Sequence, residues 1–224
     1  MKKIFVVTEG QSETNFVNRI LCEYFMEKGI LLIPNTIITG SDLRHGKVNK
    51  GGIETYGKAW TTIKNCLSTA AGKKSTYVTT MIDYYGLPKD FPGLSDINGI
   101  NNPYDKVAII EERMKEMAPE YTDIYFPYIQ LHEFETLEFA DLSGLKKIYF
   151  DQDISELEKC AEKYKNPELI NNLPETSPSK RILNCIKNYD KCGMGIDALK
   201  LVGLKKLYDS CKHFREWIIM MENI

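Results

Sequence analysis

The sequence predicts an α/β fold in which helices cover a mostly parallel sheet, followed by a helical C-terminal extension. Runs rich in β-branched and aromatic residues are separated by longer segments with helical periodicity, an order that favours parallel strands. The first such run, Lys3–Thr8 (KIFVVT), has almost no polar alternation, which suits a strand buried on both faces. The last third of the chain, in contrast, contains only helix-like segments.

Four runs are expected to form the sheet. In chain order they are Lys3–Thr8, Ile30–Thr39, Thr76–Ile82 and Tyr125–Leu131. The first is followed by a helix that begins near the N-cap Ser12 and stops at Gly29, because its apolar residues fall on one face. Helices are also expected at Ile53–Ala71 and Tyr104–Met117, and a short one at Phe134–Phe139.

Two long loops separate these elements. Residues 40–52 are rich in glycine and basic side chains, and residues 84–103 contain three prolines and three glycines. Loops of this length in compact domains are usually functional or mobile. Aromatic residues in or beside the second loop are candidates for stacking on bases, or for packing on the core as a lid. They are Tyr84, Tyr85, Phe91 and Tyr104.

The last third is expected to be helical at Ser155–Tyr164, Ser179–Tyr189 and Leu204–Met221. Asparagine, proline and glycine residues separate these segments. We therefore expect residues 1–150 to form the α/β domain and residues 151–224 to form an extension packed on that same domain.

Composition excludes several classes of protein. The 224 residues contain 29 Lys and Arg against 31 Asp and Glu, a net charge of −2 that argues against coating nucleic acid by bulk charge, although a local basic groove stays open. The longest apolar runs are far shorter than the roughly 20 residues of a membrane span. No two of the six cysteines form a C-x-x-C pair, and no signal peptide is recognisable, so we expect reduced thiols in a cytoplasmic protein.

Acidic residues follow three of the expected strands. Glu9 comes after the first strand, Asp83 after the third and Glu133 after the fourth. Ligands of parallel sheets bind beyond the carboxyl ends of the strands, so these acids are expected to converge at one edge. Because several carboxylates in a small space repel one another, and because hard oxygen ligands suit Mg²⁺ or Mn²⁺, the pattern predicts a divalent metal site.

Two neighbouring acids extend this candidate site. Glu13 follows Glu9 by four residues and lies in the first turn of the expected helix, whereas Glu135 follows Glu133 by two. Either is a candidate metal ligand. The alternatives are that Glu13 complements the helix dipole and that Glu135 is solvated.

Several strings resemble a known family. They are TEGQSE at 8–13, MIDYYGLPKDFPG at 81–93, YIQLHEFETLEF at 128–139 and PETSPSKRI at 174–182. Together they resemble a bacterial Toprim-like domain-of-unknown-function family, often encoded beside an ATPase in apparent anti-phage or mobile-element settings. Toprim domains form the metal-binding part of topoisomerases, primases and overcoming-lysogenization-defect (OLD) nucleases. The resemblance implies a Toprim-like, Rossmann-like fold and an acidic metal site.

One position departs from the Toprim pattern. The family's acidic strand end is usually Asp-x-Asp, but here Tyr85 stands where the second aspartate is expected. This departure argues against a topoisomerase or primase. It suggests that Glu133 or Glu135 supplies the missing carboxylate, as later acids do in OLD-type nucleases.

The resemblance implies a Mg²⁺- or Mn²⁺-dependent nuclease that cuts DNA or RNA, as the effector of an anti-phage or mobile-element system with an AAA- or ABC-type ATPase partner. Lys180 and Arg181, at the start of a helix, are candidates for stabilising the phosphate charge, the alternative being a solvated helix face. His132 is a candidate general base or a structural hydrogen-bonding residue. The basic loop contains further candidate phosphate contacts, namely Arg44, His45, Lys47 and Lys50.

Two other functions stay open. The chain is alternatively a catalytically weak subunit that binds an ATPase, because its Asp-x-Asp motif is incomplete. It is also compatible with a nucleotidyl or phosphotransfer enzyme that uses the same metal site on a small substrate. The sequence has no P-loop motif, so it is not itself predicted to be an ATPase of that class.

Overall fold

The computed structural model describes residues 1–38, 40–42, 47–49, 52–170 and 176–224. Its centre is a five-stranded sheet in the order β2-β1-β5-β6, with β7 also paired to β5, and all these pairs are parallel. The strands are β1 (Lys2–Thr8), β2 (Ile30–Thr36), β5 (Thr76–Asp83), β6 (Tyr125–Phe126) and β7 (Ile129–Gln130). The predicted α/β class with a mostly parallel sheet is therefore confirmed.

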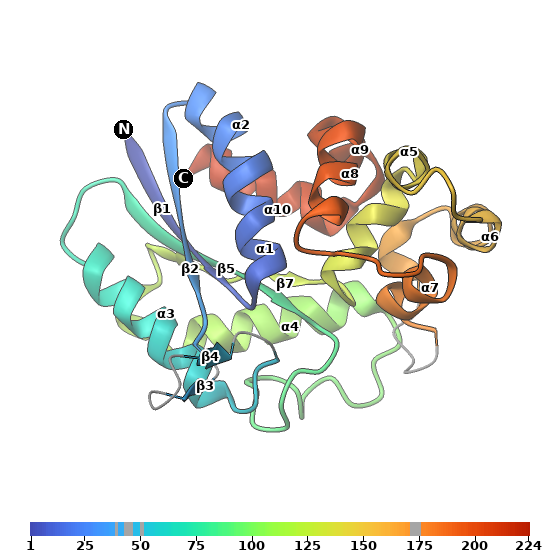
Figure 1. Ribbon diagram of the computed structural model, residues 1–224. Coiled ribbons are helices and arrows are strands. Elements are labelled where there is room, and N and C mark those ends of the chain that lie inside the picture. The colour runs from blue at the N-terminus through green and yellow to red at the C-terminus, as the bar shows by residue number, and fades with distance from the viewer. Residues whose placement is uncertain (39, 43–46, 50–51, 171–175) are drawn as a thin grey trace.

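Helices cover both faces of the sheet (Figure 1). One face packs against α3 (Tyr56–Ala70) and α4 (Pro103–Glu116). The other face packs against the first helical segment and three helices from the end of the chain. These are α1 (Gln11–Phe16), the π-helical turn Val17–Leu21, α2 (Cys22–Glu27), α8 (Met194–Val202), α9 (Leu204–Ser210) and α10 (Lys212–Asn223).

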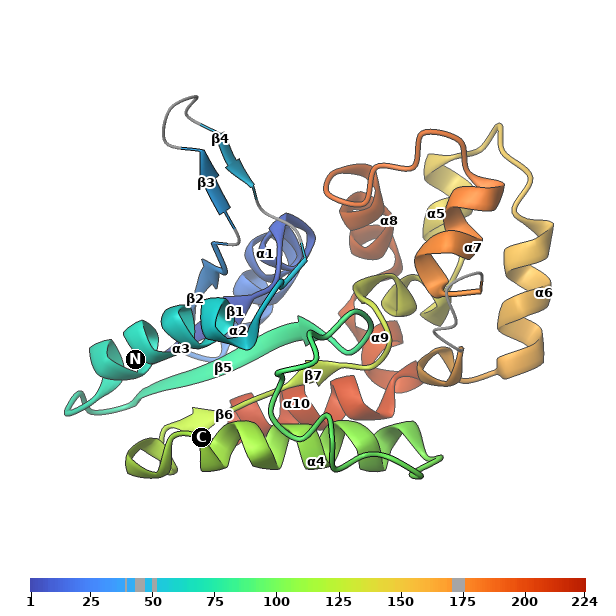
Figure 2. The same cartoon turned by 90° about the horizontal axis from the view of Figure 1, so that it is seen from below.

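A third group of helices lies beside the sheet rather than on it (Figure 2). It comprises the 3-10 helix η3 (Phe134–Ala140), α5 (Ser143–Ile148), α6 (Ser155–Tyr164), the 3-10 turn Pro167–Leu169 and α7 (Pro178–Cys185). This group has its own apolar core, which includes Leu157 and Ile182. Gly144 joins it to α8, because a Cβ atom at Gly144 would stand only 2.2 Å from the carbonyl oxygen of Ala198.

Apolar packing continues across residue 150, where the sequence suggested the helical extension begins. Phe214 and Trp217 of α10 share one core with Ile4 of β1 and Met81 of β5. The indole Nε1 of Trp217 also donates a 2.8 Å hydrogen bond to Oγ1 of Thr79 in the sheet. The final helix is thus part of the layer that covers the sheet.

The run expected as a single strand at 125–131 is divided into β6 and β7. Pro127 lies between them and has no N–H to donate to a strand ladder. The side chain of Thr80 replaces the missing ladder bonds, because its Oγ1 accepts from the N–H of Tyr128 (2.8 Å) and donates to the carbonyl of Tyr128 (2.7 Å). The sheet therefore continues past the break.

The helix expected at 204–221 is also divided. Cys211 has extended backbone angles and separates α9 from α10. The buried carboxylate of Glu168 accepts hydrogen bonds from the N–H groups of His213 and Phe214, both at 3.0 Å. A remote acid thus caps the start of α10, in the manner of an N-cap side chain.

Helices α5 and α8 were not expected from the sequence. Nor were two short strands within the predicted loop at 40–52, where β3 (Gly40–Asp42) pairs antiparallel with β4 (Lys47–Asn49). In the part of the chain with described structure, no helix has both the length and the apolar character needed to cross a bilayer.

Candidate functional site

The candidate site lies at the carboxyl ends of β1 and β5, which are neighbours in the sheet. The chain leaves β1 to form β2 on one side and returns to form β5 on the other. This reversal makes the gap between β1 and β5 the topological switch point, where parallel sheets of this kind bind ligands. Glu9 directly follows β1, as predicted, whereas Asp83 is the last residue of β5, which is one residue longer than expected. Both acids therefore lie at the switch point.

Backbone and side chain join the two strand ends. The N–H of Glu9 donates to the carbonyl of Met81 over 3.1 Å, which extends the parallel ladder by one residue. The N–H of Asp83 donates in return to Oε2 of Glu9, also over 3.1 Å. The position of the Glu9 carboxylate is consequently fixed by the backbone of the neighbouring strand.

Glu13 completes the turn from β1 into α1. Its buried carboxylate accepts a 2.8 Å hydrogen bond from the N–H of Gly10. Hydroxyl groups of Thr8, Thr14 and Thr36 form a short chain beside it, with separations of 2.6 and 2.7 Å. Glu13 thus caps its own helix, as the alternative interpretation expected, while its charge also acts on Glu9 and Asp83.

Burial and the charges of neighbouring acids raise the pKa of Glu9 and of Asp83. Burial, followed by the negative charge of Glu13, raises the pKa of Glu9 to about 7. Burial and the charges of Glu13, Glu9 and Glu135 raise the pKa of Asp83 well above its ordinary value. One oxygen of Asp83, Oδ1, is buried without any hydrogen-bond partner. A charged atom in this condition is costly, so the cluster favours a bound cation or proton.

Glu135 belongs to this cluster, whereas Glu133 faces a helix. Glu135 is buried, and burial raises its pKa; the nearby charge of Lys191 opposes this shift, while the negative charges of Glu133 and Glu13 add to it. Both carboxylate oxygens of Glu133 instead accept from Ser179 at the start of α7, from its N–H and from its Oγ, each at 2.9 Å. Of the two acids that the sequence offered as the missing carboxylate, the structure thus brings Glu135 to Glu9 and Asp83.

Lys191 is a member of the site that sequence analysis did not identify. Its Nζ lies 3.4 Å from Oε1 of Glu135. Burial lowers the pKa of Lys191, but the charges of Glu135, Glu13 and Asp83 outweigh it, so the net pKa is raised. No sequence motif identifies Lys191, because it lies in the connection between helices α7 and α8, far along the chain from the acids. Only the folded structure shows that it lies beside them.

A tight turn holds Lys191 at the site. Oδ1 of Asp190 accepts from the N–H groups of Cys192 and Gly193, both at 3.1 Å. The side chain of Asn15 in α1 donates to the carbonyl of Cys192 over 2.7 Å, which ties the turn to the first helix. A cavity of about 110 Å³ lies beneath it, lined by Glu9, Gly10, Gln11, Ser12, Glu13, Gly52, Asp83, Lys191 and Cys192.

A second layer of acid lies behind Glu135. Glu138 is fully buried, and burial raises its pKa to about 8 although the hydroxyl of Tyr189 donates to its Oε1. Its other oxygen, Oε2, has no hydrogen-bond partner. At neutral pH the raised pKa favours the protonated form of Glu138. In that form Glu138 adds no negative charge to the acidic site.

The predicted cations at the start of α7 have local contacts. The guanidinium Nε of Arg181 donates to the carbonyl of Thr176 over 2.7 Å, and the group lies 6.0 Å from the ring centroid of Tyr164 in α6. The side chain of Lys180 is exposed. The structure therefore brings Lys191, from the next connection, to the acids and leaves Lys180 and Arg181 on α7.

His132 and the loop aromatics have structural contacts. The ring Nε2 of His132 lies 2.9 Å from the carbonyl of Glu168, and burial lowers the pKa of His132 to about 4. Phe91 is buried edge-on against Tyr56, with ring centroids 5.0 Å apart, while Tyr104 donates its hydroxyl to Glu168. These positions agree with the lid interpretation. Arg44, His45 and Lys50 lie outside the described residues, as does the side chain of Lys47.

The donor atoms fit a hard divalent cation in kind. Glu9, Glu13, Asp83 and Glu135 offer only carboxylate oxygens, one of which has no partner. As these side chains are placed, no group of three or more His, Cys, Asp or Glu residues within the described ranges can hold a metal ion together. Binding of a metal by these residues would thus require their side chains to rearrange.

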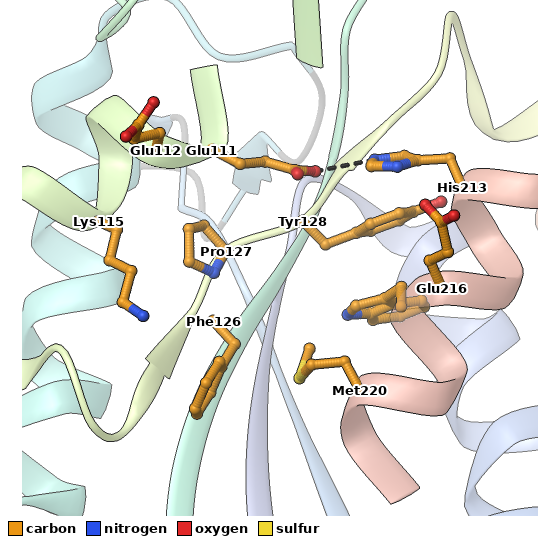
Figure 3. Close-up of a pocket in the computed structure, with 10 residues that line it drawn as sticks. Glu111, Glu112, Lys115, Phe126, Pro127, Tyr128, His213, Glu216 and Met220 are labelled. Carbon is orange, nitrogen blue, oxygen red and sulfur yellow. Dashed lines mark hydrogen bonds and ion pairs between the residues drawn. The ribbon is translucent and has the colours of Figure 1, made fainter. Parts of the chain in front are cut away.

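A larger cavity, of about 380 Å³, lies between α4 and α10 at the edge strand β6 (Figure 3). Its wall is an aromatic stack. The ring centroid of Tyr128 lies 4.4 Å from that of Trp217 and 5.0 Å from that of His213. The His213 ring is paired with Glu111 over 2.9 Å. In contrast to the acidic site, this cavity is at a sheet edge rather than at the switch point, and its buried polar groups are already paired.

Comparison with known proteins identifies the family. Residues 8–222 match the model of the domain of unknown function DUF4276. The match covers nearly the whole chain, so the protein belongs to this family. Neither the curated proteins nor the solved structures give a significant match.

Proposed function

We propose that this DUF4276 protein is a Mg²⁺- or Mn²⁺-dependent phosphodiesterase that acts on nucleic acid, with a Toprim-like arrangement of its acidic residues. The observation that carries the proposal is the gathering of Glu9, Glu13, Asp83 and Glu135 at the switch point, with Oδ1 of Asp83 buried and unpartnered. Burying mutually repelling carboxylates lowers stability, and such an arrangement is typical of a functional site.

The residues divide into ligands and supports. Glu9, Asp83 and Glu135 are the proposed metal ligands, and Glu13 holds the turn that presents Glu9. A bound divalent ion would polarise the phosphodiester and activate a water molecule. The N–H of Asp83 orients the Glu9 carboxylate, and Glu133 anchors the start of α7, which carries Lys180 and Arg181 as proposed contacts to nucleic-acid phosphates.

A nuclease assay tests the proposal. Purified protein is incubated with plasmid, single-stranded DNA and tRNA in the presence of Mg²⁺ or Mn²⁺, beside Glu9→Gln and Asp83→Asn. Glu112→Gln, at an exposed position on α4, is the matched control. Cutting by the wild type and the control, and its loss in both site variants, supports the proposal. Cutting that persists in both site variants contradicts it.

One observation favours a second function. The cation at the site in this structure is the protein's own Lys191, and Tyr85 occupies the position of the second Toprim aspartate. Both features suit a partner-binding subunit of an ATPase complex that retains the fold without turnover. Absence of cutting with any metal, both alone and with an ATPase encoded beside it, together with absence of metal binding by calorimetry, would support this alternative.

A further inference from the structure

The charge balance of the acidic site depends on Lys191. Its ammonium group contacts Glu135, and the charges of Glu13 and Asp83 also act on it. The same lysine lowers the pKa of Glu9, against the larger effects of burial and Glu13. Lys191 is thus the cation that the acids share in the described site.

One lysine does not neutralise the cluster. Lys191 brings a single positive charge to four clustered carboxylates, and its ammonium contacts only the Glu135 carboxylate directly among the described ion pairs. Oδ1 of Asp83 also remains without a partner. Since Coulomb attraction scales with charge, a doubly charged ion at this position would be attracted more strongly than the ammonium.

The ammonium of Lys191 is placed so that it can leave. Its contact with Glu135 is 3.4 Å, longer than the roughly 2.7–2.9 Å of a strong charge-assisted hydrogen bond. Its side chain is 47% exposed, whereas that of Glu135 is 3% exposed. The flexible stem of lysine can therefore turn toward solvent while the acids stay buried.

The backbone under Lys191 is, in contrast, firmly held. Asp190 accepts hydrogen bonds from Cys192 and Gly193, and Asn15 anchors Cys192 to α1. A Cβ atom at Gly193 would stand 2.3 Å from Oδ2 of Asp190, so the turn closes tightly around that carboxylate. Release of the ammonium thus requires rotation of one side chain rather than opening of the connection.

We propose that Lys191 is a built-in counter-ion that competes with the divalent metal, so that metal binding displaces its ammonium group from the acidic cavity. This inference rests on the proposed function. Lys191 stabilises the metal-free protein and sets a threshold metal concentration below which its ammonium group occupies the site in place of metal. The affinity of the site for metal is accordingly weakened by the protein's own charge.

Calorimetric titration of the metal-free protein with Mn²⁺ and Mg²⁺ at about pH 8 tests this competition. That pH lies above the pKa of Glu9, so the Glu9 carboxylate is mainly charged. Lys191→Met removes the charge while keeping an unbranched side chain, and Lys191→Arg keeps the charge. Lys187→Met, at an exposed position of the same connection, is the matched control.

Lys191→Met is expected to bind metal roughly tenfold or more tightly than the wild type, with Lys191→Arg and the control close to the wild type. Its melting temperature without metal is expected to fall, and metal is expected to restore it. Unchanged or weaker binding by Lys191→Met overturns the competition while leaving the metal-dependent function intact. Failure of every variant to bind metal overturns both.

Discussion

Oε2 of Glu9 accepts a 3.1 Å hydrogen bond from the backbone N–H of Asp83. Two acids separated by 74 positions are joined in this way at the ends of neighbouring strands. The bond favours the charged form of Glu9, yet burial and Glu13 outweigh it. The fold thus holds a carboxylate at a position where its charge is unfavourable in the absence of a compensating cation.

Replacement of Asp83 is expected to stabilise the metal-free protein and to abolish metal binding. Asp83→Asn removes one charge from the buried cluster, so the metal-free protein should gain on the order of 1 kcal/mol in its free energy of unfolding at about pH 8. The same change should abolish detectable metal binding. Urea denaturation and calorimetry measure the two effects. A metal-free variant that is less stable than the wild type would argue that the Asp83 charge is already compensated.

Stability without metal is expected to fall as pH rises from about 4.5 to 7. The pKa of Glu9 is raised from 4.5 to about 7, so its protonated form contributes stability that is complete below the unfolded-state pKa and is lost as pH rises through the folded-state value. Asp83 acts in the same direction. Glu9→Gln should remove about 2 kcal/mol of this fall, discounted for partial exposure. Denaturation across this pH range is the measurement, and an unchanged slope in Glu9→Gln contradicts it.

Much of the sheet and half of the site follow from local sequence. The run Lys3–Thr8 and the helix expected at Ser155–Tyr164 are found within a residue of their predicted bounds, because apolar pattern and end signals agree there. Glu9 and Asp83 are brought together because each lies at the carboxyl end of a strand, and strand ends in a parallel sheet share an edge. These are short-range signals.

The remaining features depend on contacts between distant segments. At Cys211 the helix is interrupted, and Glu168 caps the helix that follows. At Pro127 the strand is interrupted, and the side chain of Thr80 supplies the hydrogen bonds beside the break. Neither Glu168 nor Thr80 could be identified as a partner from the sequence around the break. The choice between Glu133 and Glu135 likewise depends on where Ser179 lies, and Lys191 reaches the acids from a connection between two helices. Sequence spacing carries no information on such pairings.

Glu133 is expected to act as a helix cap for α7. Ser179→Ala removes the 2.9 Å bond between the serine Oγ and Oε1 of Glu133, which should cost about 1 kcal/mol of folding stability. Metal affinity should stay within about twofold of the wild type, because the electrostatic partners of Glu9 and Asp83 do not include Glu133. Glu133→Gln is predicted to lower stability in the same way and to change metal affinity only slightly, because the Glu133 charge acts on Glu135 but not on Glu9 or Asp83. A large loss of metal affinity in Glu133→Gln, with little change in stability, would restore Glu133 as a ligand.

The His213–Glu111 pair is expected to give a second, separable pH effect. Burial lowers the pKa of His213, but the hydrogen bond and charge of Glu111, with Glu168 and Glu216, outweigh it and raise the net pKa above 6.5. The pair therefore contributes stability that is present below pH 6.5 and lost as pH rises through the folded-state pKa. His213→Gln should remove about 1 kcal/mol at pH 6 and less at pH 9. Equal losses at both pH values would contradict a charged His213.

The last helix is expected to fold together with the sheet. Trp217 is buried, stacks on Tyr128 and donates to Thr79, so Trp217→Ala should lower the free energy of unfolding by about 3–5 kcal/mol. Ile219→Ala, at a 37% exposed position of the same helix, should cost less than about 1 kcal/mol. Since α10 shares its core with β1 and β5, both variants should unfold in one transition. Far-ultraviolet circular dichroism measures this, because it follows the loss of backbone structure and does not depend on Trp217. An early separate transition of the C-terminal helices in Trp217→Ala would instead show that residues 151–224 form an independent unit.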